Sequence, residues 1–312
     1  MKLDISPLDT TQLDAADRIF RLAFGTRNGL PDPMKFDGDA ARIWTRFHAR
    51  NVITLGATVD SELIASAFGT IWGSFAWLGP LSVHPKHWNN HIAQQLLELT
   101  IPALDKPVTR HQALFTVAES AKHLALYRKF GFFPWFLTAL MEKPVRLLSS
   151  PDYLKFSTIP AGERDTCLKD LLTISGSLYE GLDLTQEVLN VDDQKSGDTI
   201  IILQSGRPVA FAITHYGPGT EASSHTAYIK FGAVLMGNSA PEYFDRLLAA
   251  SEQCAAARGM KRLQAGVNTG RRVAYGAMLN RGFLTIQQGV AMHRPDEAAY
   301  DRADVFAIDD WR

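Results

Sequence analysis

Residues 81–93 join the end of a predicted strand to the start of a predicted helix, and this junction could do chemistry. The stretch LGPLSVHPKHWNNHIAQQLLE places Val83 and Pro85 at the strand end, and an apolar helical repeat begins near Ile92. The first turn of a helix carries backbone N–H groups without intrahelical partners, and the helix dipole is positive at that end. A phosphate or pyrophosphate can therefore bind at this junction.

A second candidate lies in the stretch VAESAKHLALYRKFGF, which predicts a strand and then a short helix over residues 121–130. Ser120 is suited to cap the start of this helix. Gly131 follows its end, where a left-handed residue closes a helix without a Cβ penalty. Tyr127 has apolar neighbours at helical spacing, so burial in the core is one interpretation of this residue.

The first stretch resembles the phosphate-binding loop of the GNAT family of acyl-CoA-dependent N-acetyltransferases. That loop has the pattern Val-x-Pro-x-x-Arg/Gln-x-x-Gly-x-Gly/Ala. In this sequence Val83, Pro85 and Ala93 match the pattern. Trp88 stands where the family usually has Arg or Gln, and His91 stands where it usually has Gly. A Cβ at the glycine position can block close approach of a pyrophosphate, although His91 could itself reach a phosphate oxygen.

The second stretch resembles the family's Leu-Tyr-x-x-x-Gly-Phe motif at a helix end. Ser120 stands where the family often has an Asn that faces the pantetheine arm of coenzyme A. The resemblance extends over nearly all of residues 1–141 in the order of elements. The residues that match the second motif in register are Leu126, Tyr127, Gly131 and Phe132.

The resemblance implies direct transfer of an acetyl group from acetyl-CoA, the cosubstrate, to an amine in a ternary complex. The pantetheine arm would pair with the exposed edge of residues 81–83, and a backbone N–H there would polarise the thioester carbonyl. Tyr127 would protonate the departing thiolate. Glu119 is the candidate base, with His84 or a water relay as alternatives. The implied cofactor-binding residues are Leu81, Ser82, Val83, Trp88, Asn89, Asn90, His91, Ile92, Ala93, Ser120 and His123.

Three histidines near this loop have a spacing that could suggest a metal site. They are His84, His87 and His91, but Pro85 prevents a common helix face and no carboxylate accompanies them. We therefore expect no metal at this position and none in the mechanism.

The elements that must position these motifs indicate an α/β protein with a mixed sheet, in two tandem GNAT-like domains over residues 1–145 and 151–312. The connector EKPVRLLSSP separates them, and Gly25 is expected to end the first helix. Local echoes link the halves: ELIASAFGT with RPVAFAITH, and ALYRKFGF with AMLNRGF. The predicted strands cover residues 3–6, 53–59, 63–72, 75–83, 113–117, 137–141, 153–159, 199–204, 209–216, 227–235, 262–267 and 284–293. The predicted helices cover residues 12–23, 39–49, 92–104, 121–130, 161–177, 184–192, 242–258 and 271–279.

The second domain is expected to be degenerate. The passage MGNSAPEYFDRLL lacks a Val-x-Pro loop, and Met278 stands at the position of Tyr127. We infer that this copy has lost acyl-CoA chemistry. Three polar residues, Asn268, Arg271 and Arg272, could line a substrate cleft between the halves, although solvation of the arginines is the favoured interpretation. The segment DVFAIDDWR predicts a closing strand or strap.

Composition limits the remaining function classes. The 312 residues suit two domains, and a net charge of -1 gives no field that would attract nucleic acid or an anionic membrane. Two cysteines cannot form a disulfide framework, and the N-terminus lacks a signal peptide, so a cytoplasmic location is expected. Residues 63–85 carry no charge, but Gly and Pro interrupt them, and an antiparallel meander explains them better than a membrane span.

The sequence therefore predicts an N-acetyltransferase that acts on an amine of a small molecule. The alternative is a non-catalytic acyl-CoA-binding or scaffold protein that keeps the fold. A protein N-terminus or lysine as acceptor is a further variant, but a peptide groove usually needs complementary charge, which the near-neutral sequence does not advertise. A homodimer is also compatible with the sequence.

Overall fold

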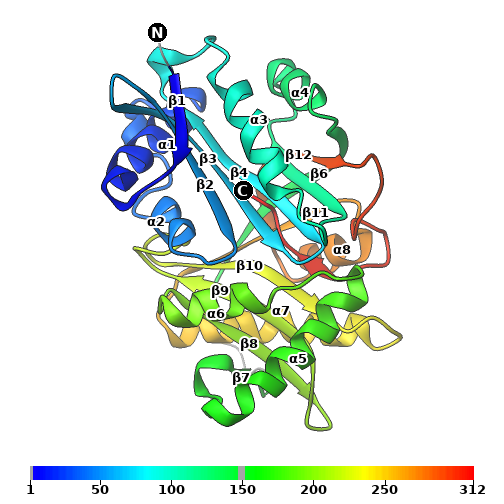
Figure 1. Cartoon of the computed structure of the whole chain (residues 1–312). Helices are drawn as coiled ribbons and strands as arrows, with labels where there is room; N and C mark the ends of the chain where they lie inside the picture. The colour runs from blue at the N-terminus through cyan, green and yellow to red at the C-terminus, as the bar shows by residue number, and fades with distance from the viewer. Residues whose placement is uncertain (1–2, 147–151) are drawn as a thin grey trace.

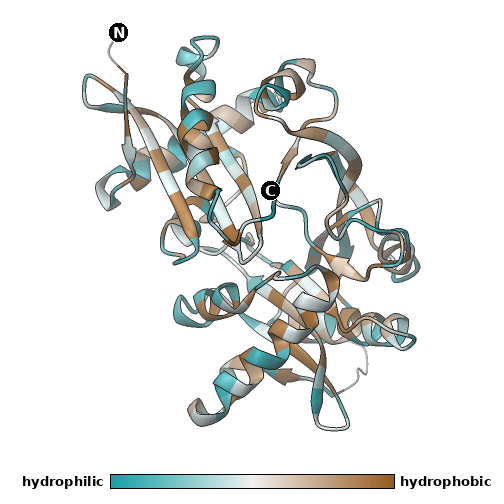
Figure 2. Ribbon diagram, turned by 45° about the vertical axis from the view of Figure 1, so that its right-hand side comes forward, coloured by the Kyte–Doolittle hydropathy of each residue, from teal (hydrophilic) through white to brown (hydrophobic). Residues whose placement is uncertain are grey.

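The computed structural model describes residues 3–146 and 152–312, and in these ranges 13 strands form one mixed sheet. Helices flank the sheet in two lobes, with the first half of the chain in one lobe and most of the second half in the other (Figure 1). Figure 2 shows hydrophobic residues concentrated along the strands, as expected for a sheet whose faces are buried. The predicted α/β class with a mixed sheet is confirmed.

The first half supplies the elements of one lobe in the predicted order. Its helices are α1 (Leu13–Arg27), α2 (Arg42–Phe47), α3 (Ile92–Leu104) and α4 (Ala121–Arg128). Its strands are β1 (Leu3–Pro7), β2 (Val52–Val59), β3 (Glu62–Trp72), β4 (Phe75–Val83), β5 (His111–Thr116) and β6 (Phe133–Pro144).

The second half repeats this order. Its helices are α5 (Ala161–Leu178), α6 (Thr185–Asp193), α7 (Ala240–Ala257) and α8 (Arg272–Asn280). Its strands are β7 (Leu154–Lys155), β8 (Gly197–Gln204), β9 (Arg207–Tyr216), β10 (Thr226–Val234), β11 (Arg262–Asn268), β12 (Leu284–Arg294) and β13 (Ala307–Ile308).

The two halves exchange their last long strands. The strand order is β1-β2-β3-β4-β5-β12-β6-β11-β10-β9-β8-β7, with β13 paired to β10. Strand β12 from the second half pairs with β5 of the first, and β6 from the first half pairs with β11 of the second. The two exchanged strands also pair with each other. One sheet therefore runs through both lobes, and each half completes the other.

Helices α1 and α3 each have a buried apolar stripe. These stripes face the sheet, as helical periodicity requires. They consist of Leu13, Ala16, Ile19, Phe20 and Ala23 on α1, and of Ile92, Leu96, Leu97 and Ile101 on α3.

The prediction that Gly25 ends the first helix is wrong. Helix α1 continues to Arg27, and Gly25 is buried inside it. A Cβ at this position would lie 2.2 Å from the carbonyl oxygen of Pro33. The glycine therefore permits close packing of the following loop and does not act as a helix stop.

Two predicted strands differ from the structure. The strand predicted at residues 153–159 is reduced to β7, because a 3-10 turn over Phe156–Thr158 follows and buries Phe156. The strand predicted at residues 137–141 is longer, because β6 pairs with both β11 and β12 and continues into the predicted connector. Residues 147–151 of that connector lie outside the described residues. No helix of the described ranges is long and apolar enough to cross a membrane.

Candidate active site

Strands β4 and β5 separate halfway along their length. They pair in parallel from Phe75↔His111 to Leu78↔Leu114, and their pairing ends there. A register shift of β4 against β3 accompanies the Gly79-Pro80 step. Residues 81–83 then pair only with β3, so within the described chain their other edge has no strand partner. Leu81, Ser82 and Val83 therefore pair with a strand on one side only, and β4 and β5 diverge beyond Leu78 and Leu114.

The loop after β4 presents the start of α3. Asn89 and His91 have φ angles of 67° and 58°, in the left-handed region. No side chain caps the 13-residue helix α3, whose first residues are Ile92 and Ala93. Its first N–H groups are therefore available to an anion. The left-handed angle at His91 explains a preference for glycine at this position, and histidine bears a cost of about 1–2 kcal/mol there.

Two side chains shape this loop in ways that the sequence did not reveal. The indole Nε1 of Trp88 donates to the carbonyl oxygen of Val83 at 2.7 Å, which ties the indole to the strand end. Lys122, in the first turn of α4, donates to the side-chain oxygen of Asn89 at 2.5 Å. The ammonium of Lys122 therefore reaches the loop from α4. Within the loop, Trp88 occupies the position at which the GNAT family usually has Arg or Gln. Asn90 donates to the carbonyl oxygen of His87 at 3.3 Å and stays exposed.

Ser120 caps α4 as predicted. Its hydroxyl accepts from the backbone N–H of His123 at 3.4 Å and lies 2.7 Å from the Nδ1 atom of the same histidine. Burial, Arg27 and Lys122 lower the pKa of His123. Glu119 is different, because its side chain is 76% exposed and pairs with Arg27 at 3.4 Å.

Tyr127 is buried on the α4 side of the separating strands. It lies in one apolar cluster with Leu78 and Leu114, the last paired residues of β4 and β5, and Leu81 packs against this cluster. Its hydroxyl has no hydrogen-bond partner among the described residues, and burial raises its pKa to about 12. The residue is therefore both a core aromatic and a neutral phenol beside the point where β4 and β5 diverge.

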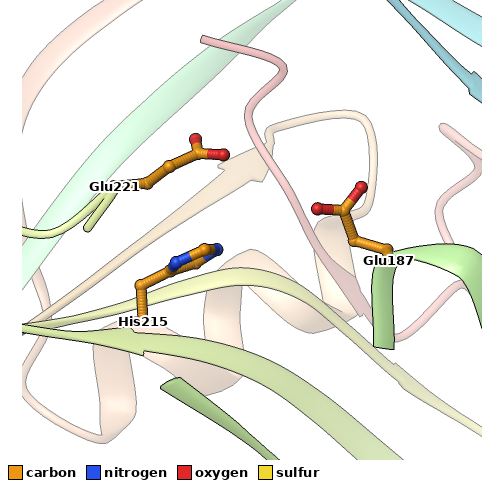
Figure 3. A group of neighbouring side chains, drawn as sticks. All are labelled: Glu187, His215 and Glu221. Atoms are coloured by element: carbon orange, nitrogen blue, oxygen red, sulfur yellow. The ribbon is translucent and has the colours of Figure 1, made fainter. Parts of the chain in front are cut away.

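A buried polar group between the lobes was missed by the sequence interpretation. Glu187 of α6, His215 of β9 and Glu221 have side-chain ligand atoms within 4.8 Å of one another. Figure 3 shows the two carboxylates pointing toward each other with the imidazole beside them. The ammonium of Lys230 lies 2.6 Å from Glu187 and 2.5 Å from Glu221, and Arg46 lies 2.7 Å from Glu221. These side chains supply the positive charge that the two carboxylates need, so the group does not require a metal.

The arginine pair of the second half is only partly as expected. Arg272 is exposed, but Arg271 is fully buried, which contradicts the expectation of a solvated side chain. Arg271 lies 2.8 Å from Asp301 and 2.7 Å from Asp309, and it donates to the carbonyl oxygen of Ala307 at 3.0 Å. Asn268 is also buried, where it donates to Thr138 at 3.2 Å. These contacts hold the end of the described chain in place.

Comparison with known proteins agrees with this geometry. Residues 16–132 match the model of the acetyltransferase (GNAT) family, a segment that contains β4, the loop, α3 and α4. No curated protein matches the sequence.

Solved structures share the fold of the whole chain. A putative acetyltransferase from Pyrococcus horikoshii has 12% identity and a TM-score of 0.68, with 99% of this chain and 95% of that chain covered. A tandem GNAT protein from the clavulanic acid biosynthesis pathway has 10% identity and a TM-score of 0.60, with 96% and 99% covered. A GCN5-related N-acetyltransferase from Sphaerobacter thermophilus has 11% identity and a TM-score of 0.57, with 94% and 95% covered. The chain therefore has the fold of tandem GNAT proteins, and residues 16–132 of its first half match the GNAT family model.

Proposed function

We propose that the first half binds acetyl-CoA and transfers its acetyl group to an amine of a small molecule. The observation that carries this proposal is the edge of residues 81–83, which has no second strand partner among the described residues and is followed by the uncapped start of α3. An extended ligand with amide groups along its length and a diphosphate at one end matches this arrangement. The pantetheine arm and the diphosphate of acetyl-CoA have that form.

The phosphate end of the ligand would meet two sources of positive potential. The first is the free N–H groups of α3 around Ile92 and Ala93. The second is Lys122, whose contact with Asn89 places its ammonium at the loop. Lys122 would take over the charge that an arginine supplies at the position of Trp88.

The thioester end would lie where β4 leaves β5. A backbone N–H of residues 81–83 would donate to the carbonyl oxygen as the amine attacks, since preorganised donors stabilise a developing oxyanion. The raised pKa of Tyr127 keeps its phenol protonated at neutral pH. This phenol would donate to the departing thiolate, in a transfer made directly within a ternary complex.

A base must also accept a proton from the amine. Glu119 is exposed and paired with Arg27, which weakens its case. Burial, His87 and Lys86 lower the pKa of His84, so a neutral imidazole is available near neutral pH. His84 and Glu119 are both retained as candidates, and the pH profiles of kcat for His84→Gln and Glu119→Gln would separate them.

Calorimetric titration of the full chain with acetyl-CoA tests the binding step, together with thermal unfolding at saturating acetyl-CoA. We expect the variant His91→Glu to weaken binding, because it adds a negative charge at the start of α3. The matched control is Gln204→Glu, which adds the same charge at an exposed position of β8. An unchanged affinity in His91→Glu would contradict the proposed position of the diphosphate.

An amine panel assayed with wild type and Tyr127→Phe tests the chemical step. Turnover that falls in Tyr127→Phe with acetyl-CoA affinity retained supports catalysis. Binding of acetyl-CoA without turnover on any amine points to the non-catalytic alternative, and no binding by wild type refutes the acetyltransferase assignment.

A further inference from the structure

The second half has a separation of parallel strands, the second gap, that corresponds to the one between β4 and β5. Strands β10 and β11 pair in parallel from Thr226↔Arg262 to Ile229↔Ala265 and then separate. Lys230 lies at the register shift of β10 against β9. Both halves thus have four parallel pairs followed by a separation next to a register shift.

The chain itself occupies this second gap. Strand β13 runs antiparallel to β10, with Gly232 opposite Ile308 and Ala233 opposite Ala307. We propose that residues 305–312 are the resident strand ligand of the second gap, so that the chain binds one acyl-CoA, in the first half. The part of this proposal that concerns acyl-CoA rests on the function proposed above.

A glycine on the β11 wall of the gap fits the 305–312 segment closely. A Cβ at Gly232 of β10 would lie 3.4 Å from the Cβ of Ile308. A Cβ at Gly266 of β11 would lie 2.2 Å from the Cβ of Asp310, closer than two carbon atoms can approach. The segment therefore leaves no room for a side chain at Gly266, whereas a Cβ at Gly232 would make only an ordinary contact.

Side chains of the segment alternate between two cores, as in a strand within a sheet. Phe306 and Ile308 belong to the core beneath α7, where the ring of Phe306 lies 5.3 Å from that of Phe244. Val305 and Ala307 belong to the core between the lobes. An incoming pantetheine arm would have to expose all of these apolar groups to water.

Polar contacts fix the same segment. Arg271 binds the carbonyl oxygen of Ala307 and the carboxylate of Asp309, and Tyr228 donates to Asp310 at 2.9 Å. The start of α7 is also less suited to a diphosphate, because Pro241 lies in its first turn and has no N–H group. Arg272 and Arg281 still line a cavity beside the start of α7, so the proposal depends on occupancy of the gap by the segment.

Hydrogen exchange with the full chain, free and with saturating acetyl-CoA, tests the proposal. We expect slow exchange at residues 305–312 in the free protein and no change there when acetyl-CoA is added. New protection should appear only in the first half, in residues 81–93 and 120–127, and calorimetry should give one acetyl-CoA per chain. Faster exchange of residues 305–312 on adding acetyl-CoA, or two acetyl-CoA per chain, would overturn the proposal.

The variant Gly266→Ala tests the fit of the segment without any ligand. Its Cβ should displace Asp310 and increase the exchange rate of residues 305–312 at least tenfold, whereas β1 to β4 should exchange as in wild type. Gly276→Ala is the matched control, because a Cβ on that residue of α8 meets nothing within 4 Å. If residues 305–312 exchange at the same rate in Gly266→Ala and Gly276→Ala, the segment does not lie in the gap. If the exchange results are as expected but wild type does not bind acetyl-CoA, the segment still lies in the gap. The statement that the chain binds one acyl-CoA would then be wrong, together with the proposed function.

Discussion

The two halves of the molecule share one arrangement of strands but differ in what lies between the central pair. In the first half the edge of residues 81–83 is free of a strand partner, and in the second half β13 pairs with β10 at the corresponding place. The second gap is closed by apolar and ionic contacts, so its residues serve stability. The comparison shows that a separated pair of parallel strands can be left without a strand between them or can be filled by one more strand.

A single position on the fourth helix of each half illustrates the same difference. Tyr127 in α4 and Met278 in α8 are both buried against the sheet. Packing requires only a large apolar side chain at this position, and methionine fills it well. Acyl transfer would need the hydroxyl that only Tyr127 carries.

The largest effect is expected from removing that hydroxyl. Tyr127→Phe should lower kcat by about 10²–10⁴-fold, the range typical of lost general acid catalysis, with little change in acetyl-CoA affinity. Met278→Leu, at the corresponding position of the second half, should leave kcat unchanged. Steady-state kinetics with an amine identified from the panel measures both, and equal losses would mean that the halves do not differ in chemistry.

The next largest effect is expected at the anchor of the 305–312 segment. Arg271→Met leaves Asp301 and Asp309 buried without their cation, and breaking such a pair costs about 3–5 kcal/mol in the free energy of unfolding. Chemical denaturation measures the loss. The exposed neighbour gives the control Arg272→Met, for which we expect a change below about 0.5 kcal/mol. A similar small change in Arg271→Met would show that the second gap is not held by this arginine.

A smaller effect concerns pH. Burial lowers the pKa of His215 to about 4 and that of His111 to about 3, below the ordinary value of 6.5. Both rings bind a proton more readily in the unfolded chain, so their stabilising contribution is complete above pH 6.5 and is lost as pH falls toward 4 for His215 and toward 3 for His111. Burial raises the pKa of Asp309 to about 6, which acts in the opposite direction between pH 4 and 6.

Replacing His215 isolates one of these contributions. His215→Leu should reduce the slope of unfolding free energy against pH by about 1.4 kcal/mol per pH unit between pH 4.5 and 6. Neither ring nitrogen of His215 has a partner among the described residues, so the replacement breaks no hydrogen bond. Denaturation series at several pH values measure the slope, with the exposed His48→Gln as control. An unchanged slope would mean that His215 is already charged in the folded protein.

The smallest effect is expected at the start of α4. Ser120→Ala removes the cap on the N–H of His123 and should cost about 1 kcal/mol of stability. The corresponding residue before α8 is Arg271, which makes no side-chain cap. Ser239→Ala, at the exposed residue before α7 that makes no side-chain cap, should change stability less, and thermal unfolding compares the two. If the two variants lose the same stability, the cap at Ser120 does not contribute.

Much of the fold follows from local sequence. The bounds of α3 were predicted to the residue, and Ser120 and Gly131 mark the ends of α4 as expected. These features depend on neighbours within about four residues, through helical periodicity and capping. The closing strand in DVFAIDDWR was also confirmed as β13, although its partner was not predicted.

Local patterns could not identify the ionic contacts that join distant segments. Lys122 and Asn89 are both exposed polar residues in sequence terms, and only the fold brings α4 to the loop. Glu187 and Lys230 were likewise missed, because buried ion pairs are selected by tertiary packing and carry no periodic signal.

The sequence by itself determined where most helices and strands lie, which loop could bind a phosphate, and which half lacks the matching motif. Only the tertiary structure decided that β6 and β12 change places and that residues 305–312 enter the second gap. The reason is that a strand's alternation of side chains records which face is buried but not which strand lies beside it. Backbone hydrogen bonds are alike for every partner, so the choice depends on which edges remain free once the whole chain has packed.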